Sequence, residues 1–311
     1  MAGDTVAARA VRSARTGAEH PEDVPYHRAL VGDRRQVGRG IAAITLVVVG
    51  LFGAGSAITW LAARIDLAMG RVNPTLGGDD VTIAFQAAGA ASVAVLIPWS
   101  MVVQRLLYGV RGRSLVSVVS RFRFDEFGRA LVFAGPLSVL CITAVSLVTP
   151  VEPARFSTVD LVGLLAVTLL LTPLQAAGEE FGFRGLVLRV ASSWSRDPRT
   201  SLVLGVVVSA VLFAAIHVQG NPWLNIHYLT LGVGAALITC HTGGLETAVV
   251  LHALNNTVGF AFALVVHTDL LGGTGAPVLL LLAVPTVATT AAVLLSRRHR
   301  PTAEGVRAST A

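Results

Sequence analysis

Two adjacent carboxylates and an arginine interrupt a long apolar part of the chain. Glu179, Glu180 and Arg184 follow the largely apolar run 159–174 and precede another at 186–190. A charged side chain inside a bilayer costs roughly 2.5–3.5 kcal/mol or more, so such residues indicate function. On a helix Glu180 and Arg184 are one turn apart and can pair, whereas Glu179 points about 100° away. The spacing predicts a structural ion pair beside a free carboxylate, Glu179, that can act as a base.

Two histidines and an asparagine interrupt later apolar runs. His217 ends one of them, and a single histidine on an apolar helix is more often a hydrogen-bonded core residue than a catalytic one. His252 and Asn256 are four residues apart, so a helix presents both on one face. The alternatives to catalysis are interhelical hydrogen bonding by these residues and a buried ion network at the glutamates.

Together these residues could hydrolyse an amide bond. Glu179 would remove a proton from water, and His217 would orient that water or shuttle the proton. His252 and Asn256 would donate hydrogen bonds to the oxyanion of the tetrahedral intermediate.

The same residues resemble the motifs of a known family. Three motifs, Glu-Glu-x-x-x-Arg, Phe-x-x-x-His and His-x-x-x-Asn, occur in that order on three predicted helices. Here they read Glu179-Glu180-x-x-x-Arg184, Phe213-x-x-x-His217 and His252-x-x-x-Asn256. The sequence thus resembles the CPBP family of CAAX prenyl endopeptidases and bacteriocin-processing intramembrane proteases, over about residues 159–260.

The resemblance implies an intramembrane endopeptidase that cleaves a membrane-associated protein or peptide, CAAX-like tails included. It also implies that Glu179 is the base and Glu180 its partner or second carboxylate. The expected catalytic set is Glu179, Glu180, His217, His252 and Asn256, with Arg184 in a structural ion pair.

A metal-free site is favoured, with zinc as the alternative. Glu179, His217 and His252 could supply three zinc ligands and leave a position for water. The sequence has no His-Glu-x-x-His on one helix, which is the usual way to hold two zinc ligands rigidly. No other cofactor is expected.

Other classes of membrane protein use similar residues. A transporter or proton-conducting protein is the main alternative, because buried Glu, His and Arg also form ion pathways. Here the carboxylates form one cluster rather than a path. A haem or quinone protein would need His217 and His252 but not the glutamates beside them, and a scaffold or immunity protein with a dead site would not need every motif residue.

The composition predicts an all-α, multi-pass membrane protein. Of 311 residues, 53% are hydrophobic and 14% charged. About eight apolar runs are long enough to span a bilayer. We place them near 41–63, 81–104, 130–149, 159–180, 201–217, 224–241, 246–267 and 276–296.

The arginines predict the topology. All 24 basic residues are Arg, and with eight spans twenty of them fall on one side, three on the other, and Arg184 within the membrane. Basic loops stay in the cytoplasm, so both termini are expected there, in what is expected to be a bacterial plasma membrane. The lipid bilayer is the expected partner besides the substrate. Nucleic acid is not, because the arginines alternate with apolar spans.

Three regions follow from this pattern. Residues 1–39 are expected to be a disordered, Arg-rich cytoplasmic arm, 40–296 the helical membrane domain, and 297–311 a cytoplasmic tail. One conflict remains within the membrane domain. With straight helices, His217 lies roughly 25 Å from the cytoplasmic end of its span, against roughly 15 Å for Glu179 and 10 Å for His252. One site therefore requires either that the helix before His217 tilts strongly and the loop after it dips inward, or that the span limits differ.

Overall fold

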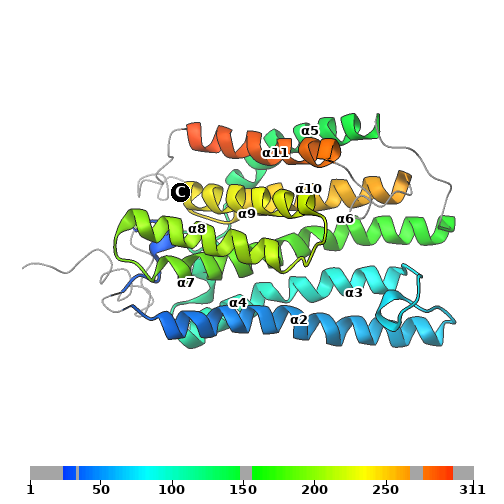
Figure 1. Ribbon diagram of the computed structural model, residues 1–311, viewed down its shortest axis with the longest axis horizontal. Helices are drawn as coiled ribbons and strands as arrows, with labels where there is room; N and C mark the ends of the chain where they lie inside the picture. Colours follow the sequence, from blue (N-terminus) through cyan, green and yellow to red (C-terminus); the bar gives the residue numbers. More distant parts are fainter. Residues whose placement is uncertain (1–23, 33–34, 148–155, 267–275, 297–311) are drawn as a thin grey trace, which may run out of the picture.

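The protein is a bundle of helices that run along one long axis (Figure 1). The computed structural model describes residues 24–32, 35–147, 156–266 and 276–296. The longer helices in these residues are α2 (Val37–Ala68), α3 (Ile83–Ala94), α4 (Leu96–Tyr108), α5 (Phe124–Ser146), α6 (Thr158–Glu180), α8 (Pro198–Ala215), α9 (Pro222–Thr242), α10 (Glu246–Val266) and α11 (Ala276–Leu295).

Seven helical segments in the described residues are long and apolar enough to cross a membrane. They are Val37–Ala68, Ile83–Tyr108, Phe124–Ser146, Thr158–Ser192, Pro198–Ala215, Pro222–Thr242 and Glu246–Val266. Large apolar side chains point outward, such as Val132 and Leu170, which are 77% and 70% exposed. The chain is therefore an all-α, multi-pass membrane protein. The predicted eighth span falls on α11, of which Leu282–Leu295 forms a shorter apolar helix, so the eighth crossing and the side of the termini stay predictions.

The sixth helix continues without a break past the glutamates. After α6 the chain forms a π-helix, η4 (Phe181–Val187), and then the short α7 (Leu188–Ser192). π-Helical segments inside α-helices are frequent at functional sites. The hydroxyl of Ser209 on α8 donates to the carbonyl of Phe183 at 3.0 Å. Gly178 lets α6 approach the α3–α4 junction, because a Cβ there would lie 2.2 Å from the carbonyl oxygen of Val93.

The α8–α9 hairpin explains the depth of His217. Asp197 caps α8 with Pro198 as its first residue, and Asn221 caps α9 with Pro222 as its first residue. α8 ends at Ala215, and both helices stop well short of the end that α2 and α6 reach (Figure 1). His217 therefore lies in a loop at mid-bundle depth rather than at a membrane surface, which removes the depth conflict.

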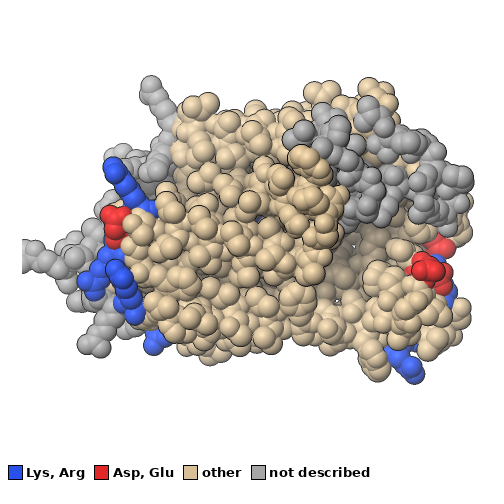
Figure 2. Space-filling model, viewed as in Figure 1, with Lys and Arg blue, Asp and Glu red and all other residues tan. Residues whose placement is uncertain are grey.

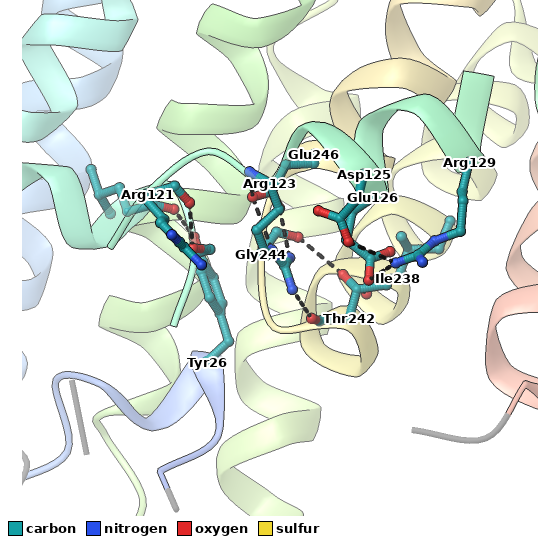
Figure 3. Close-up of polar contacts among 12 residues, drawn as sticks. Tyr26, Arg121, Arg123, Asp125, Glu126, Arg129, Ile238, Thr242, Gly244 and Glu246 are labelled. Atoms are coloured by element: carbon teal, nitrogen blue, oxygen red, sulfur yellow. Dashed lines mark hydrogen bonds and ion pairs between the residues drawn. The ribbon is translucent and has the colours of Figure 1, made fainter. Parts of the chain in front are cut away.

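Charged side chains gather at the two ends of the molecule (Figure 2). At the end where α2 begins, the Arg123 guanidinium donates to both oxygens of Glu246 and to the Thr242 carbonyl (Figure 3). These contacts join the start of α5 to the tight α9–α10 turn, where Gly243 has a φ of 74°.

Part of the predicted N-terminal arm is folded against this end. Tyr26, in the short helix η1 (Tyr26–Arg28), is fully buried and donates to the carbonyl of Leu115. Burial raises the pKa of Tyr26 far above its ordinary value, so it stays a neutral donor. The guanidinium carbon of Arg189 lies 3.8 Å from the centre of the Tyr26 ring. The predicted disorder over 1–39 is therefore wrong for residues around Tyr26, while residues 1–23 lie outside the described residues.

Candidate active site

The two glutamates end α6 and face different partners. Glu180 is fully buried, and its Oε1 lies 3.1 Å from Nη1 of Arg184 and accepts a 2.7 Å hydrogen bond from Nδ1 of His252. The guanidinium carbon of Arg184 lies 4.0 Å from the centre of the Phe213 ring on α8. The Glu180 carboxylate thus connects α6, η4 and α10, and the arginine extends this network to α8.

Glu179 faces two imidazole rings without bonding to either. Its Oε2 lies 3.9 Å from Nε2 of His217 and 4.0 Å from Nε2 of His252. These distances are too long for direct hydrogen bonds but fit a shared water molecule. The same oxygen is buried and makes no hydrogen bond within the described residues. Buried polar atoms are almost always hydrogen-bonded, so this oxygen is suited to a water or a substrate group.

His217 is held by its ring nitrogen and by its ring face. Its Nδ1 donates to the Phe213 carbonyl at 2.7 Å, which leaves Nε2 of the neutral ring unprotonated toward Glu179. The ring stacks on Tyr228 of α9, with centroids 3.8 Å apart and planes at 22°. The next residue, Val218, has a φ of 47°, a strained conformation for a β-branched side chain. The turn that places this histidine is therefore built at an energetic cost.

Asn256 lies one turn beyond His252 on α10. Its Nδ2 is 3.2 Å from Nε2 of His252, and its Oδ1 accepts from the amide of Asn255 at 3.0 Å. Nδ1 of His252 already donates to Glu180, so in the neutral ring Nε2 accepts from Asn256. The asparagine keeps a second N–H for another acceptor.

These side chains border a cavity of about 240 Å³. Its lining comes from α6, the α8–α9 hairpin, α10 and α11. The residues are Gln175, Glu179, His217, Gln219, Leu224, His227, Tyr228, His252, Asn255, Asn256, Gly259, Phe260 and Leu282. The cavity gives a small molecule or a chain segment access to Glu179.

The structure brings all six predicted site residues together, and it adds others. Tyr228 carried no sequence signal, because it reaches the site from α9 through its stacking on His217. Gln175 lies one helical turn before Glu179, so the period of the helix could have placed it there. His227 is buried and also lines the cavity.

The residues proposed as zinc ligands lie near one another, with Oε2 of Glu179 3.9 and 4.0 Å from the Nε2 atoms of His217 and His252. In the described part of the chain, no three His, Cys, Asp or Glu side chains meet the geometry of a metal site, and the choice between a glutamate and a zinc mechanism stays a prediction. Both ring nitrogens of His252 already face other groups, the Glu180 carboxylate and the Asn256 amide. A zinc ion would have to displace that amide.

Comparison with known proteins identifies the domain that carries this site. Residues 161–258 match the family of type II CAAX prenyl endopeptidases, Rce1-like. The chain contains an Rce1-like domain. This match confirms the predicted CPBP membership over almost the predicted range, and it implies a peptidase. All three motifs lie within the Rce1-like domain.

A bacterial relative covers more of the chain. The uncharacterized protein YyaK of Bacillus subtilis (strain 168) is 27% identical over 219 residues, which span 68% of this chain and 73% of the relative. The similarity therefore extends beyond the Rce1-like domain into the flanking helices. No solved structure matches the chain.

Proposed function

We propose that this protein is an intramembrane endopeptidase of the glutamate type. The observation that carries the proposal is the position of Glu179 Oε2. It is buried, makes no hydrogen bond within the described residues, and lies 3.9 and 4.0 Å from the Nε2 atoms of His217 and His252. A water molecule between Oε2 of Glu179 and the unprotonated Nε2 of His217 can donate one O–H to each, and it is ready to lose a proton to the carboxylate.

The proposed reaction transfers the acyl group of the substrate to water. The water oxygen bonds to the carbonyl carbon of the substrate, its proton passes to Glu179, and the carbonyl electron pair moves to oxygen. When the C–N bond breaks, Glu179 returns the proton to the leaving nitrogen. His217 keeps the water in place through its unprotonated Nε2.

The oxyanion needs donors that are already in position. Asn256 has one N–H beyond its contact with His252 and supplies a hydrogen bond. Nε2 of His252 accepts the other N–H of that amide and so keeps Asn256 in position. Glu180 and Arg184 do not touch the reacting atoms in this proposal. They position His252 through the 2.7 Å bond to its Nδ1.

The proposed substrate is a membrane-associated peptide or protein, and the proposed location is a bacterial plasma membrane. The bacterial relative and the seven candidate spans support the location. The Rce1-like match supports a peptide substrate, with a CAAX-like tail as one candidate.

The proposal is tested in liposomes that contain the full chain. Candidate membrane peptides are offered to wild-type protein, to Glu179→Gln and to Glu126→Gln, a variant of an acid outside the site. Ion flux is measured on the same liposomes. Cleavage that Glu179→Gln alone abolishes, without ion flux, supports the endopeptidase. Flux that depends on Glu179 with no cleavage supports the transporter instead.

A further inference from the structure

On one side of the glutamates, η4, α7 and the first turns of α10 are closely packed. On η4, α7 and the residue that follows, every residue from Gly182 to Ser193 is buried. On α10 the same is true from Glu246 to His252. These residues lie between the site and the end where α2 begins. A cavity of about 350 Å³ lies at that end between α5, α9, α10 and α11, but Glu179, His217 and His252 do not line it.

Polar contacts close that end further. The Arg123 guanidinium holds the fully buried Glu246 and the Thr242 carbonyl (Figure 3). Beside it, Arg189 donates to the backbone carbonyl of Ser114 at 2.7 Å and packs on the ring of Tyr26. A peptide that approached Glu179 past the start of α5 or past α7 would have to break these contacts.

On the opposite side of the glutamates the described residues are less closely packed. On α10, from Ala253 to Val266, Gly259 is the single buried residue. Gln175, Gly259 and Phe260 line the cavity beyond the site, on the side away from the packed end. The α8–α9 hairpin ends level with His217, and Figure 2 shows the molecule hollowed beside that point.

The two ends also differ in charge. The described arginines of the N-terminal segment and of the loop after α4 lie at the packed end (Figure 2). The described part of the other end has two arginines, Arg64 and Arg71, against four acids, Asp66, Asp79, Asp80 and Asp160. By the positive-inside rule the packed end faces the cytoplasm, and the cavity opens toward the outside.

The lining of the cavity indicates what enters it. Four carboxamides, Gln175, Gln219, Asn255 and Asn256, border the space around Glu179. A carboxamide both donates and accepts hydrogen bonds, as a peptide backbone does. An isoprenoid chain offers neither. The lining therefore suits an extended peptide segment.

We infer that an extended peptide segment reaches Glu179 from the extracytoplasmic half of the membrane, through the cavity beside the α8–α9 loop. The part of this inference that names a peptide substrate rests on the proposed peptidase function. The part that names the route to Glu179 rests only on the packing and the charge distribution. Among the candidate substrates, this favours a peptide segment outside the cytoplasm over a CAAX-like tail anchored at the cytoplasmic face.

Labelling with a membrane-impermeant maleimide tests the access directly. In the full chain without its two cysteines (Cys141→Ala, Cys240→Ala), Gln219→Cys reports on the cavity. Gly220→Cys is a second reporter, because a Cβ there meets no neighbour within 4 Å. Val211→Cys, which is 53% exposed on the outer face of α8, is the control for a lipid-facing residue. Asp79→Cys and Arg113→Cys mark the two ends.

On intact cells we expect Asp79→Cys and both loop variants to be labelled, and Val211→Cys and Arg113→Cys to stay unlabelled. Inverted vesicles should give the opposite result for the loop and end variants. Three results would overturn the inference. The loop variants could be labelled only from the side on which Arg113→Cys is labelled, or they could stay as unlabelled as Val211→Cys. Asp79→Cys could also be labelled only from the cytoplasm. None of these readouts depends on cleavage, so a failure here is distinct from a failure of the proposed peptidase.

Discussion

The Nδ1 atom of His252 donates a 2.7 Å hydrogen bond to Oε1 of Glu180, although the neighbouring Glu179 is the glutamate that faces the cavity. One carboxylate therefore fixes the tautomer of the histidine, and the other stays available for water. Adjacent residues on a helix point about 100° apart, which allows this division. The same division makes the two glutamates experimentally separable.

The ion pair between Glu180 and Arg184 should be required for folding. Both side chains are fully buried, so Arg184→Ala leaves a buried charge without its partner. Such a loss typically costs roughly 3–5 kcal/mol. We expect poor accumulation of folded protein, measured by detergent-solubilised yield and thermal unfolding. Arg129→Ala is the matched control, because its ion pairs are exposed and worth about 0–1 kcal/mol. If the Arg184→Ala protein folds and cleaves normally, the ion pair is not required for folding.

Stacking on Tyr228 should matter for catalysis more than for folding. The ring holds His217, and an aromatic contact of this kind is worth roughly 0.5–1.5 kcal/mol. If that energy positions the histidine in the transition state, Tyr228→Ala lowers kcat roughly 2- to 12-fold. Tyr228→Phe keeps the ring and should keep the rate. Equal rates in wild type and Tyr228→Ala would show that the loop positions His217 without the stack.

The sequence predicts contacts correctly where they depend only on the helical period. The pairing of Glu180 with Arg184, and the shared face of His252 and Asn256, follow from a spacing of four residues. The bond from His252 to Glu180 does not, because it joins α10 to α6 across 72 positions. The depth of His217 in the bundle could not be predicted from the sequence pattern either. Apolar composition does not say that α8 and α9 stop partway along the bundle.

The N-terminal arm shows a similar limit. Its charge and its prolines predict disorder, and the fully buried ring of Tyr26 contradicts that locally. A single aromatic residue that packs on a buried arginine, here Arg189, leaves no periodic signal in the sequence. Such contacts become visible only when the tertiary structure is known.

A large side chain at Gly259 should fill the cavity that Gly259 and Glu179 both line. A Cβ at this buried helical position meets no neighbour within 4 Å, and the position lines the cavity. Gly259→Ala should raise stability by up to about 1 kcal/mol, because alanine favours the helix. Gly259→Trp should fold and lose cleavage, measured on the same peptide as wild type. Full cleavage by folded Gly259→Trp would place substrate access elsewhere.

Activity should not depend on a bound metal. Glu179 and His217 are proposed to activate water directly, so cleavage should survive exhaustive chelation followed by gel filtration. The measurement is the cleavage rate, with metal content determined on the same sample. Stoichiometric zinc, with activity lost on its removal and restored by its return, would replace the glutamate mechanism with a metal one.

The most direct test compares cleavage by wild type and Glu179→Gln under single-turnover conditions, with thermal unfolding measured on both proteins. The substitution keeps the size of the side chain and removes the base. Loss of a general base lowers rates roughly 10²–10⁴-fold, so we predict at least that loss with an unchanged unfolding temperature. Cleavage by Glu179→Gln at the wild-type rate would contradict the central claim that this carboxylate activates water.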